Sequence, residues 1–226
     1  MLLELCAYTI ASCRIAAEAG VDRVELCSDP AQGGTTPGIG MVRAAMDMGL
    51  TVFPMVRPRG GDFMYSADEL DVIHREIRAF RELGCPGIVT GILHREGTID
   101  TDRMKQAMDL AGPMAVTCHK AFDAVPNATE ALEALVDAGC ARVLTSGLAP
   151  DAVAGSTVIA GLVKQAAGRI AILVGGGVRS GNIRQLMDTT GAKEFHSSAI
   201  TVRTNGRDAD DREVEALVRA VGMDGR

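Results

Sequence analysis

Two short segments near the start of the chain share one pattern, an apolar strand that carries a glutamate and ends in a cysteine. They are residues 2–6 (LLELC) and 23–27 (RVELC). Because side chains alternate between the two faces of a strand, each glutamate shares a face with the cysteine two residues later. If the two strands are parallel neighbours, two thiols lie side by side above two carboxylates, at the carboxyl ends of the strands.

Paired thiols in this position allow three interpretations. Neighbouring strands lie about 4.8 Å apart, so Cys6 and Cys27 can come close enough to share one ion. Thiolates favour soft metals such as Cu(I), and two sulfur ligands are too few for a structural zinc site. The alternatives are that both are small buried core residues or that they form a redox disulfide. The sequence alone leaves these three open.

Strand alternation collects further polar side chains on the face that would point into a barrel. The whole inward set is Glu4, Cys6, Glu25, Cys27, Arg57, Thr117, His119, Glu194 and His196. Buried carboxylates are costly unless they are paired. The cationic partners that we expect are Arg57, Arg59, Lys120 and Arg142. Titratable groups gathered at one end of a barrel are typical of a functional site, and the alternative is an internal ion network without function.

A histidine at the end of a predicted strand, His119, is followed at once by Lys120 and, four residues after the histidine, by Asp123. A histidine in this position could polarise a carbonyl group or exchange a proton. His196 has the same position on the last predicted strand. The catalytic candidates are therefore His119, Glu25 and Asp123, against the simpler interpretation that His119 is only hydrogen-bonded.

Glycines and serines end the last two predicted strands, at residues 175–177 (GGG) and 197–198 (SS). Barrels frequently hold phosphate between these two loops, through backbone amides and a helix N-terminus. Nearby arginines would favour a small anionic or phosphorylated molecule. The residues that we predict to bind it are Arg57, Arg59, Lys120, Ser146, Gly176, Gly177, His196 and Ser198.

Short apolar strands and helices alternate from end to end of the chain. The predicted strands are 2–6, 22–27, 51–56, 87–91, 114–119, 142–146, 170–174 and 193–198. The predicted helices are 10–19, 39–48, 67–83, 101–111, 128–138, 152–167, 180–189 and 211–221. Eight such units in 226 residues predict an α/β fold, a single-domain TIM-type (β/α)8 barrel over residues 1–226. An open doubly wound sheet is the alternative, but its strands would be apolar on both faces.

Composition excludes several classes of partner. The net charge is −6, with acidic and basic residues interspersed, and there is no tryptophan and no basic stripe, so we expect no nucleic-acid partner. No apolar stretch reaches the roughly 18 residues that a membrane span needs. We see no signal peptide, which predicts a cytoplasmic protein whose six cysteines are free thiols.

Seven motifs occur in order along nearly the whole chain. They are LELC (3–6), DRVELC (22–27), GGTTP (33–37), RPRGGDF (57–63), HKAFD (119–123), LTSG (144–147) and EFHSS (194–198). In these motifs the chain resembles the CutC family of copper homeostasis proteins. The resemblance implies a cytoplasmic TIM-type barrel that forms a homo-oligomer, a dimer or a tetramer. It also implies a role in copper handling, with Cys6 and Cys27 as Cu(I) ligands.

The chain departs from the family pattern at three positions. Lys120 replaces the usual arginine, Cys118 stands where an aromatic residue is expected, and Val174 where proline is expected. Lysine keeps the positive charge but loses the planar fork of arginine, so two-pronged recognition of a carboxylate or phosphate at this position is weakened.

Two hypotheses about function follow from the residues and the resemblance. In the first, the protein binds Cu(I) through Cys6 and Cys27 and buffers copper. In the second, it is a lyase, isomerase or hydrolase that acts on a small anionic or phosphorylated molecule at the same barrel mouth. Copper binding requires neither Arg57 nor His119, so the second hypothesis stays open.

Overall fold

The structure, a computed structural model, describes residues 1–222 of the chain. Its strands are β1 (Leu2–Ala7), β2 (Arg23–Leu26), β3 (Val52–Pro54), β4 (Gly87–Thr90), β5 (Ala115–Cys118), β6 (Arg142–Thr145), β7 (Ala171–Val174) and β8 (Glu194–Ser197). Its α-helices are α1 (Ile10–Ala19), α2 (Ile39–Asp47), α3 (Ala67–Leu83), α4 (Thr101–Ala111), α5 (Ala128–Ala138), α6 (Ser156–Ala166), α7 (Ile183–Thr190) and α8 (Asp211–Gly222). Two short 3-10 helices are Pro30–Gln32 and Lys120–Ala124.

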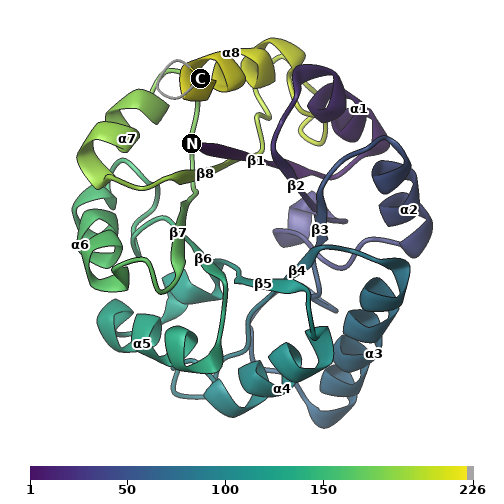
Figure 1. The fold of residues 1–226 in the computed structure, drawn as a ribbon, viewed down its shortest axis with the longest axis vertical. Coiled ribbons are helices and arrows are strands. Elements are labelled where there is room, and N and C mark those ends of the chain that lie inside the picture. The colour runs from purple at the N-terminus through teal and green to yellow at the C-terminus, as the bar shows by residue number, and fades with distance from the viewer. Residues whose placement is uncertain (223–226) are drawn as a thin grey trace.

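The strands form one parallel sheet in the order β3-β2-β1-β8-β7-β6-β5-β4. A parallel bridge between Met55 and Val89 joins the two end strands and closes the sheet into a barrel. The helices form a ring around it, as Figure 1 shows. The predicted TIM-type (β/α)8 barrel is therefore confirmed.

Most element bounds lie within two residues of the predicted ones. The helices α3, α4 and α5 begin and end where the sequence predicted. Two of them, α3 and α5, end at glycines in the left-handed region, Gly84 with φ +85° and Gly139 with φ +88°. Two helices begin later than predicted, at Ser156 and Ile183. The preceding residues form turns instead, closed by bonds such as that from the Asn182 N–H to the Arg179 carbonyl (3.0 Å).

Alternation along the strands separates two apolar regions. The outward side chains of β1 and β2, such as Leu3 and Leu26, join the large core between the barrel and its helices. The inward ones, Cys6 and Cys27, belong to a separate cluster inside the barrel, together with Phe53, Met55 and Val89. The predicted faces of both strands are therefore confirmed.

An ion network fills the amino-terminal half of the barrel. Arg23 bridges Glu4 and Glu194, and Arg142 also binds Glu194 (3.1 Å). The ring of Phe53 lies between the two guanidinium groups, 5.0 and 5.2 Å from them. Of the four cationic partners that the sequence predicted for the glutamates, only Arg142 is one. The prediction missed Arg23, which shares the inward face of β2 with Glu25.

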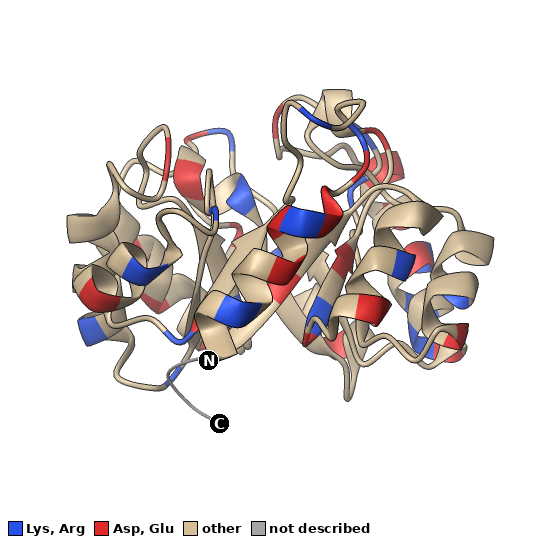
Figure 2. Cartoon of the chain, turned by 90° about the horizontal axis from the view of Figure 1, so that it is seen from above, with Lys and Arg blue, Asp and Glu red and all other residues tan. Residues whose placement is uncertain are grey.

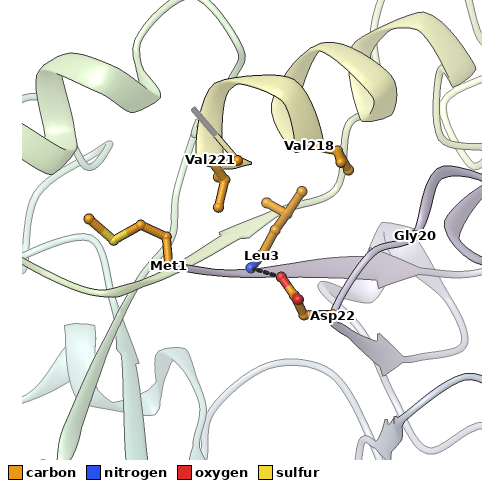
Figure 3. Close-up of a pocket in the computed structure, with 7 residues that line it drawn as sticks. Met1, Leu3, Gly20, Asp22, Val218 and Val221 are labelled. Carbon is orange, nitrogen blue, oxygen red and sulfur yellow. Dashed lines mark hydrogen bonds between the residues drawn. The ribbon is translucent and has the colours of Figure 1, made fainter. Parts of the chain in front are cut away.

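The start of β1 is held by a side-chain contact and covered on its outward face by the last helix. The carboxylate of Asp22 accepts a hydrogen bond from the Leu3 N–H (2.8 Å), and Val218 and Val221 of α8 cover β1 (Figure 3). A pocket of about 160 Å³ here contains a single charged side chain, Asp22, among its described lining residues. This pocket therefore lacks the set of polar groups that a functional site needs, and its contacts contribute to stability.

The longer connections lie at the opposite end from the two termini (Figure 2). Acidic and basic residues are interspersed over the helices in the same view, as the sequence indicated. Among residues 1–222, no helix has the length and apolar character that crossing a membrane requires.

The packing around Phe53 makes a prediction about Gly87 on β4. A Cβ atom at Gly87 would lie 2.3 Å from the Phe53 ring and 2.6 Å from the Ala115 carbonyl oxygen. We expect Gly87→Ala to lower the free energy of unfolding by about 1–3 kcal/mol, because ring and backbone must shift. Urea unfolding monitored by circular dichroism measures the change.

Gly161→Ala is the matched control. Gly161 lies inside α6, where a Cβ meets nothing within 4 Å, so the substitution should raise stability by about 0.5–1 kcal/mol through helix propensity. Equal stability of the two variants would contradict the packing argument.

Candidate functional site

A cavity of about 110 Å³ lies at the carboxyl-terminal mouth of the barrel. It is lined by Cys6, Tyr8, Glu25, Gly33, Met55, Arg57, Phe63, His119, Lys120, Leu144 and His196. These residues come from the ends of β1, β2, β3, β5, β6 and β8 or from the loops after them. This is the end where barrel enzymes and binding proteins assemble their sites.

The two cysteines of the repeated motif both lie in this region, but only Cys6 lines the cavity. Its Cα pairs with Glu25 across β1 and β2, which places Cys27 farther along its strand. The Cys27 thiol donates to the Glu25 carboxylate (3.6 Å). Gly34 covers Cys27, because a Cβ there would lie 3.2 Å from its sulfur. Both sulfurs are thus shielded from solvent.

His196 connects the ion network to the mouth. Its Nδ1 lies 2.7 Å from Oε1 of Glu4, and its Nε2 lies 3.8 Å from Oε2 of Glu25. Burial alone would lower the pKa of His196, but the charge of Glu25 and hydrogen bonds with Cys6 and Glu4 raise it well above its usual value. Burial alone would raise the pKa of Glu4, but His196 and Arg23 lower it to about 2. The pair is therefore an imidazolium and a carboxylate.

The groups around Cys6 divide into one thiol whose pKa is lowered and two groups whose pKa is raised. A hydrogen bond with Cys27 lowers the pKa of Cys6 well below its usual value, against the effect of burial, and His196 adds to the shift. The same bond and burial raise the pKa of Cys27. Burial and the charge of Cys6 raise the pKa of Glu25. Cys6 is thus the thiolate of the pair.

Three of these groups could hold a metal ion together. One ligand atom each of Cys6, Glu25 and His196 lies within 4.8 Å of the other two. A thiolate and an imidazole are ligands that Cu(I) accepts, whereas a carboxylate suits harder ions. The second sulfur, that of Cys27, interacts directly with Cys6.

His119, on the opposite side of the barrel at the end of β5, is held as a neutral ring. Its Nδ1 accepts a hydrogen bond from the Ala121 N–H (3.1 Å), so the ring proton lies on Nε2. Burial and the charge of Arg57 lower the pKa of His119 to about 3. Phe63 packs beside the ring, with centroids 4.8 Å apart. Nε2 is buried and has no hydrogen-bond partner among residues 1–222.

The two arginines that the sequence assigned to anion binding have different positions. Arg57 lines the cavity, and its guanidinium donates to the carbonyl oxygens of Gln32, Gly34 and Gly61 at 2.7–2.9 Å. It therefore joins the loops after β2 and β3. Arg59 lies outside the cavity and pairs with Glu69 (2.5 Å) and Asp62 (3.0 Å).

Asp123 and Ser146 organise the loop after β6 and do not line the cavity. The Asp123 carboxylate accepts hydrogen bonds from the backbone N–H and the hydroxyl of Ser146, both at 3.0 Å, and from Leu148 N–H (3.2 Å). Lys120 does line the cavity, and its Nζ lies 3.8 Å from Asp123. Of the three catalytic candidates, the structure brings His119 and Glu25 to one cavity.

Gly176, Gly177 and Ser198 also lie outside the cavity lining. The N–H and hydroxyl of Ser180, just before α7, donate to the Glu213 carboxylate at 2.7 and 2.8 Å. A protein carboxylate thus occupies donors that a phosphate would use. Gly176 instead permits a close approach of two loops, since a Cβ there would lie 2.8 Å from the Cβ of Ser146.

Sequence reasoning missed several cavity residues, among them Tyr8 and Phe63. Tyr8 is the next residue after Cys6 on the inward face, so extending the alternation by one step would have found it. Phe63 belongs to an irregular loop, where no periodic signal exists. Only the packing of that loop against His119 places it at the site.

Comparisons with known proteins agree with the motifs. The sequence model of the CutC family matches residues 1–201. A curated relative from Chromobacterium violaceum, named as a CutC family protein, is 45% identical over 199 residues, which cover 88% of this chain and 81% of that protein. A CutC family protein of Salmonella paratyphi B is 46% identical and covers the same share of this chain, with 79% of its own length aligned.

Solved structures give the same result. CutC from Streptococcus agalactiae, to which its name ascribes a role in copper homeostasis, superimposes with a TM-score of 0.84 at 34% identity. The superposition covers 89% of this chain and all of that one (100%). Deoxyribose phosphate aldolase from Aeropyrum pernix, at 17% identity and a TM-score of 0.64, shares the barrel fold alone.

The buried contacts of Glu4 make a prediction about stability. Glu4→Gln leaves Arg23 and His196 without their shared carboxylate, and removing one member of a buried ion pair costs about 3–5 kcal/mol. The pKa of Glu4 in the folded protein, about 2, lies below its ordinary value of 4.5. The stability that the ionised Glu4 contributes is therefore complete above pH 4.5 and is lost as the pH falls toward 2. Urea unfolding at pH 7 and at pH 3 should show a smaller difference between variant and parent at pH 3.

Glu194→Gln is the control, because the side chain of Glu194 is 18% exposed and water can replace part of its interaction. Its effect at pH 7 should be smaller than that of Glu4→Gln. A loss for Glu4→Gln that is the same at both pH values would contradict the assigned carboxylate.

Proposed function

This chain belongs to the CutC family, and we propose that it binds one Cu(I) ion through Cys6 and Cys27 at the mouth of its barrel. In this proposal the protein takes part in copper homeostasis in the cytoplasm, and copper is its cargo. The observation that carries the proposal is the contact between two buried thiols, one of which is stabilised as a thiolate.

The donor set suits Cu(I). Thiolate sulfur is the ligand that favours Cu(I) over harder ions, and both sulfurs lie in a region with little access to water, where cysteine is 5% or less exposed. A reducing compartment keeps such thiols free of disulfides. The free state of Cys6 and Cys27 in the structure agrees with this requirement.

The charges around the thiols also suit a monovalent cation. Cu(I) with two thiolates has a net charge of about −1 by simple addition of formal charges. The imidazolium of His196, whose pKa is raised, lies beside Cys6 and offsets that charge. His196 thus stabilises the thiolates electrostatically, while Glu4 keeps it protonated through the 2.7 Å contact.

An anaerobic Cu(I) titration against a strong competing chelator tests this proposal. The parent chain should bind one equivalent of Cu(I), and the Cys6→Ser, Cys27→Ser double variant should lose at least two orders of magnitude in affinity, because hydroxyl oxygen is a poor ligand for a soft ion. The double variant Cys13→Ser, Cys140→Ser is the matched control, since both residues are buried in the outer core. Equal affinity in the parent and the Cys6, Cys27 variant would refute the site.

The pH dependence of Cu(I) binding gives a second test. Cys27 and Glu25 both have raised pKa values, so the Cys27 proton must leave to solvent when the sulfur binds the ion. Affinity should therefore rise about tenfold per pH unit between pH 6 and 8. The same competition measured across this range gives the slope, and a flat profile would mean that Cys27 keeps its proton and is not a ligand.

A further inference from the structure

We propose that the cavity at the barrel mouth also binds a small α-hydroxycarboxylate, whose carboxylate accepts a hydrogen bond from Nε2–H of His119. This inference does not rest on copper binding, because it assigns a function to groups that the two thiols leave unexplained. The ligand class follows from three features of the cavity, which are its unpartnered polar atoms, its charges and its size.

The first feature is a buried donor with no acceptor. His119 lines the cavity, and its tautomer is fixed by the 3.1 Å bond from the Ala121 N–H to Nδ1. Nε2–H is therefore a donor, and it has no partner among residues 1–222. A buried polar group without a partner costs about 1–3 kcal/mol, so such a group at a cavity wall is stabilised by a ligand or a water molecule that accepts its hydrogen bond.

The second feature is the charge beside this donor. Arg57 lines the cavity and is close enough to His119 to depress the basicity of the ring. Lys120, at the rim, has a half-exposed side chain, and its ammonium group lies 3.8 Å from Asp123. The positive charge of Arg57 near a neutral N–H donor, with that of Lys120 on the same cavity lining, favours an anionic acceptor such as a carboxylate.

A second unpartnered atom lies elsewhere on the cavity lining. Oε1 of Glu25 is buried and has no hydrogen-bond partner in the described chain, and Glu25 lines the same cavity. A hydroxyl group can both donate and accept hydrogen bonds, so it can pair with a carboxyl group in either protonation state. A ligand with a carboxylate and a neighbouring hydroxyl would satisfy His119 and Glu25 together.

The third feature is size. The cavity volume of about 110 Å³ is smaller than the roughly 150 Å³ that holds a benzene molecule. It therefore suits a ligand of about five or six non-hydrogen atoms, such as glycolate or lactate. Phosphorylated sugars are too large for this space, and donors before α7 that could bind a phosphate are already bonded to Glu213.

The experiment is a titration of metal-free protein with glycolate. Calorimetry measures the affinity, and NMR monitors the proton resonance of the His119 Nε2–H. Acetate, which lacks the hydroxyl, and ethylene glycol, which lacks the carboxylate, are the comparison probes. We expect glycolate to bind most tightly, acetate more weakly and ethylene glycol not measurably. Glycolate should also shift the Nε2–H resonance. The proposal would be overturned if ethylene glycol bound as tightly as glycolate or if glycolate did not bind. In the second case the cavity would hold only water.

Variants locate the ligand. His119→Phe keeps a ring but removes the donor, and it should weaken glycolate binding at least tenfold. His119→Gln restores an amide N–H and should recover part of that loss. His94→Phe, at a histidine with a 48% exposed side chain, is the matched control and should bind as the parent does. Unchanged binding in His119→Phe would contradict the assignment.

A last variant separates this proposal from copper binding. Cys27 is a proposed Cu(I) ligand but does not line the cavity, so Cys27→Ser should lose tight Cu(I) binding and keep glycolate binding within about twofold. Loss of glycolate binding in this variant, with the fold intact by circular dichroism, would mean that the two sites are one and would overturn the inference.

Discussion

The carboxylate of Glu4, which water does not reach at the centre of the barrel, is the constraint on which the site depends. A buried charge of this kind is tolerated only when its neighbours neutralise it. Arg23 does so from β2 and His196 from β8. Their strands both neighbour β1 in the sheet, and both residues are in register with Glu4 itself, so the pairing of β1 with β2 and with β8 creates these contacts.

The state of the mouth follows from this pairing. Glu25 and Glu4 raise the pKa of His196, so a positive charge faces Cys6 from the next strand. The hydrogen bond with Cys27 and, after it, this charge lower the pKa of the Cys6 thiol in a place where burial alone would raise it. Burial and the charge of that thiolate raise the pKa of Glu25. The ion pair of Glu4 and His196 is thus one of the interactions that set the protonation of groups at the mouth.

His119 and His196 show how the environment decides the chemistry of a side chain at the same end of one barrel. His196 lies between two carboxylates and carries a charge, whereas His119 lies near Arg57 and stays neutral. The first can stabilise negative sulfur, and the second can only donate one hydrogen bond. The proposed copper site on β1 and β2 and the proposed small-molecule site beside β5 would therefore use different atoms, although both would share a wall of the cavity through Cys6 and Glu25.

The sequence by itself determined the barrel and the inward face of its strands. Residue alternation placed Glu4, Cys6, Glu25 and Cys27 inside, and the glycine that follows helices such as α3 fixed where those helices end. The alternation of side chains between the two faces of a strand depends only on neighbouring residues, so the local sequence is enough to predict it.

The tertiary structure decided which of the inward residues meet. Arg23 pairs with Glu4 because the two residues are opposite each other in the register of β1 and β2. Arg59 instead pairs with Glu69, and Asp123 binds the loop after β6. Each of these contacts depends on loop paths or on strand register between residues far apart in the chain. No periodic pattern encodes them, and so the sequence predicted the residues of the site better than their partners.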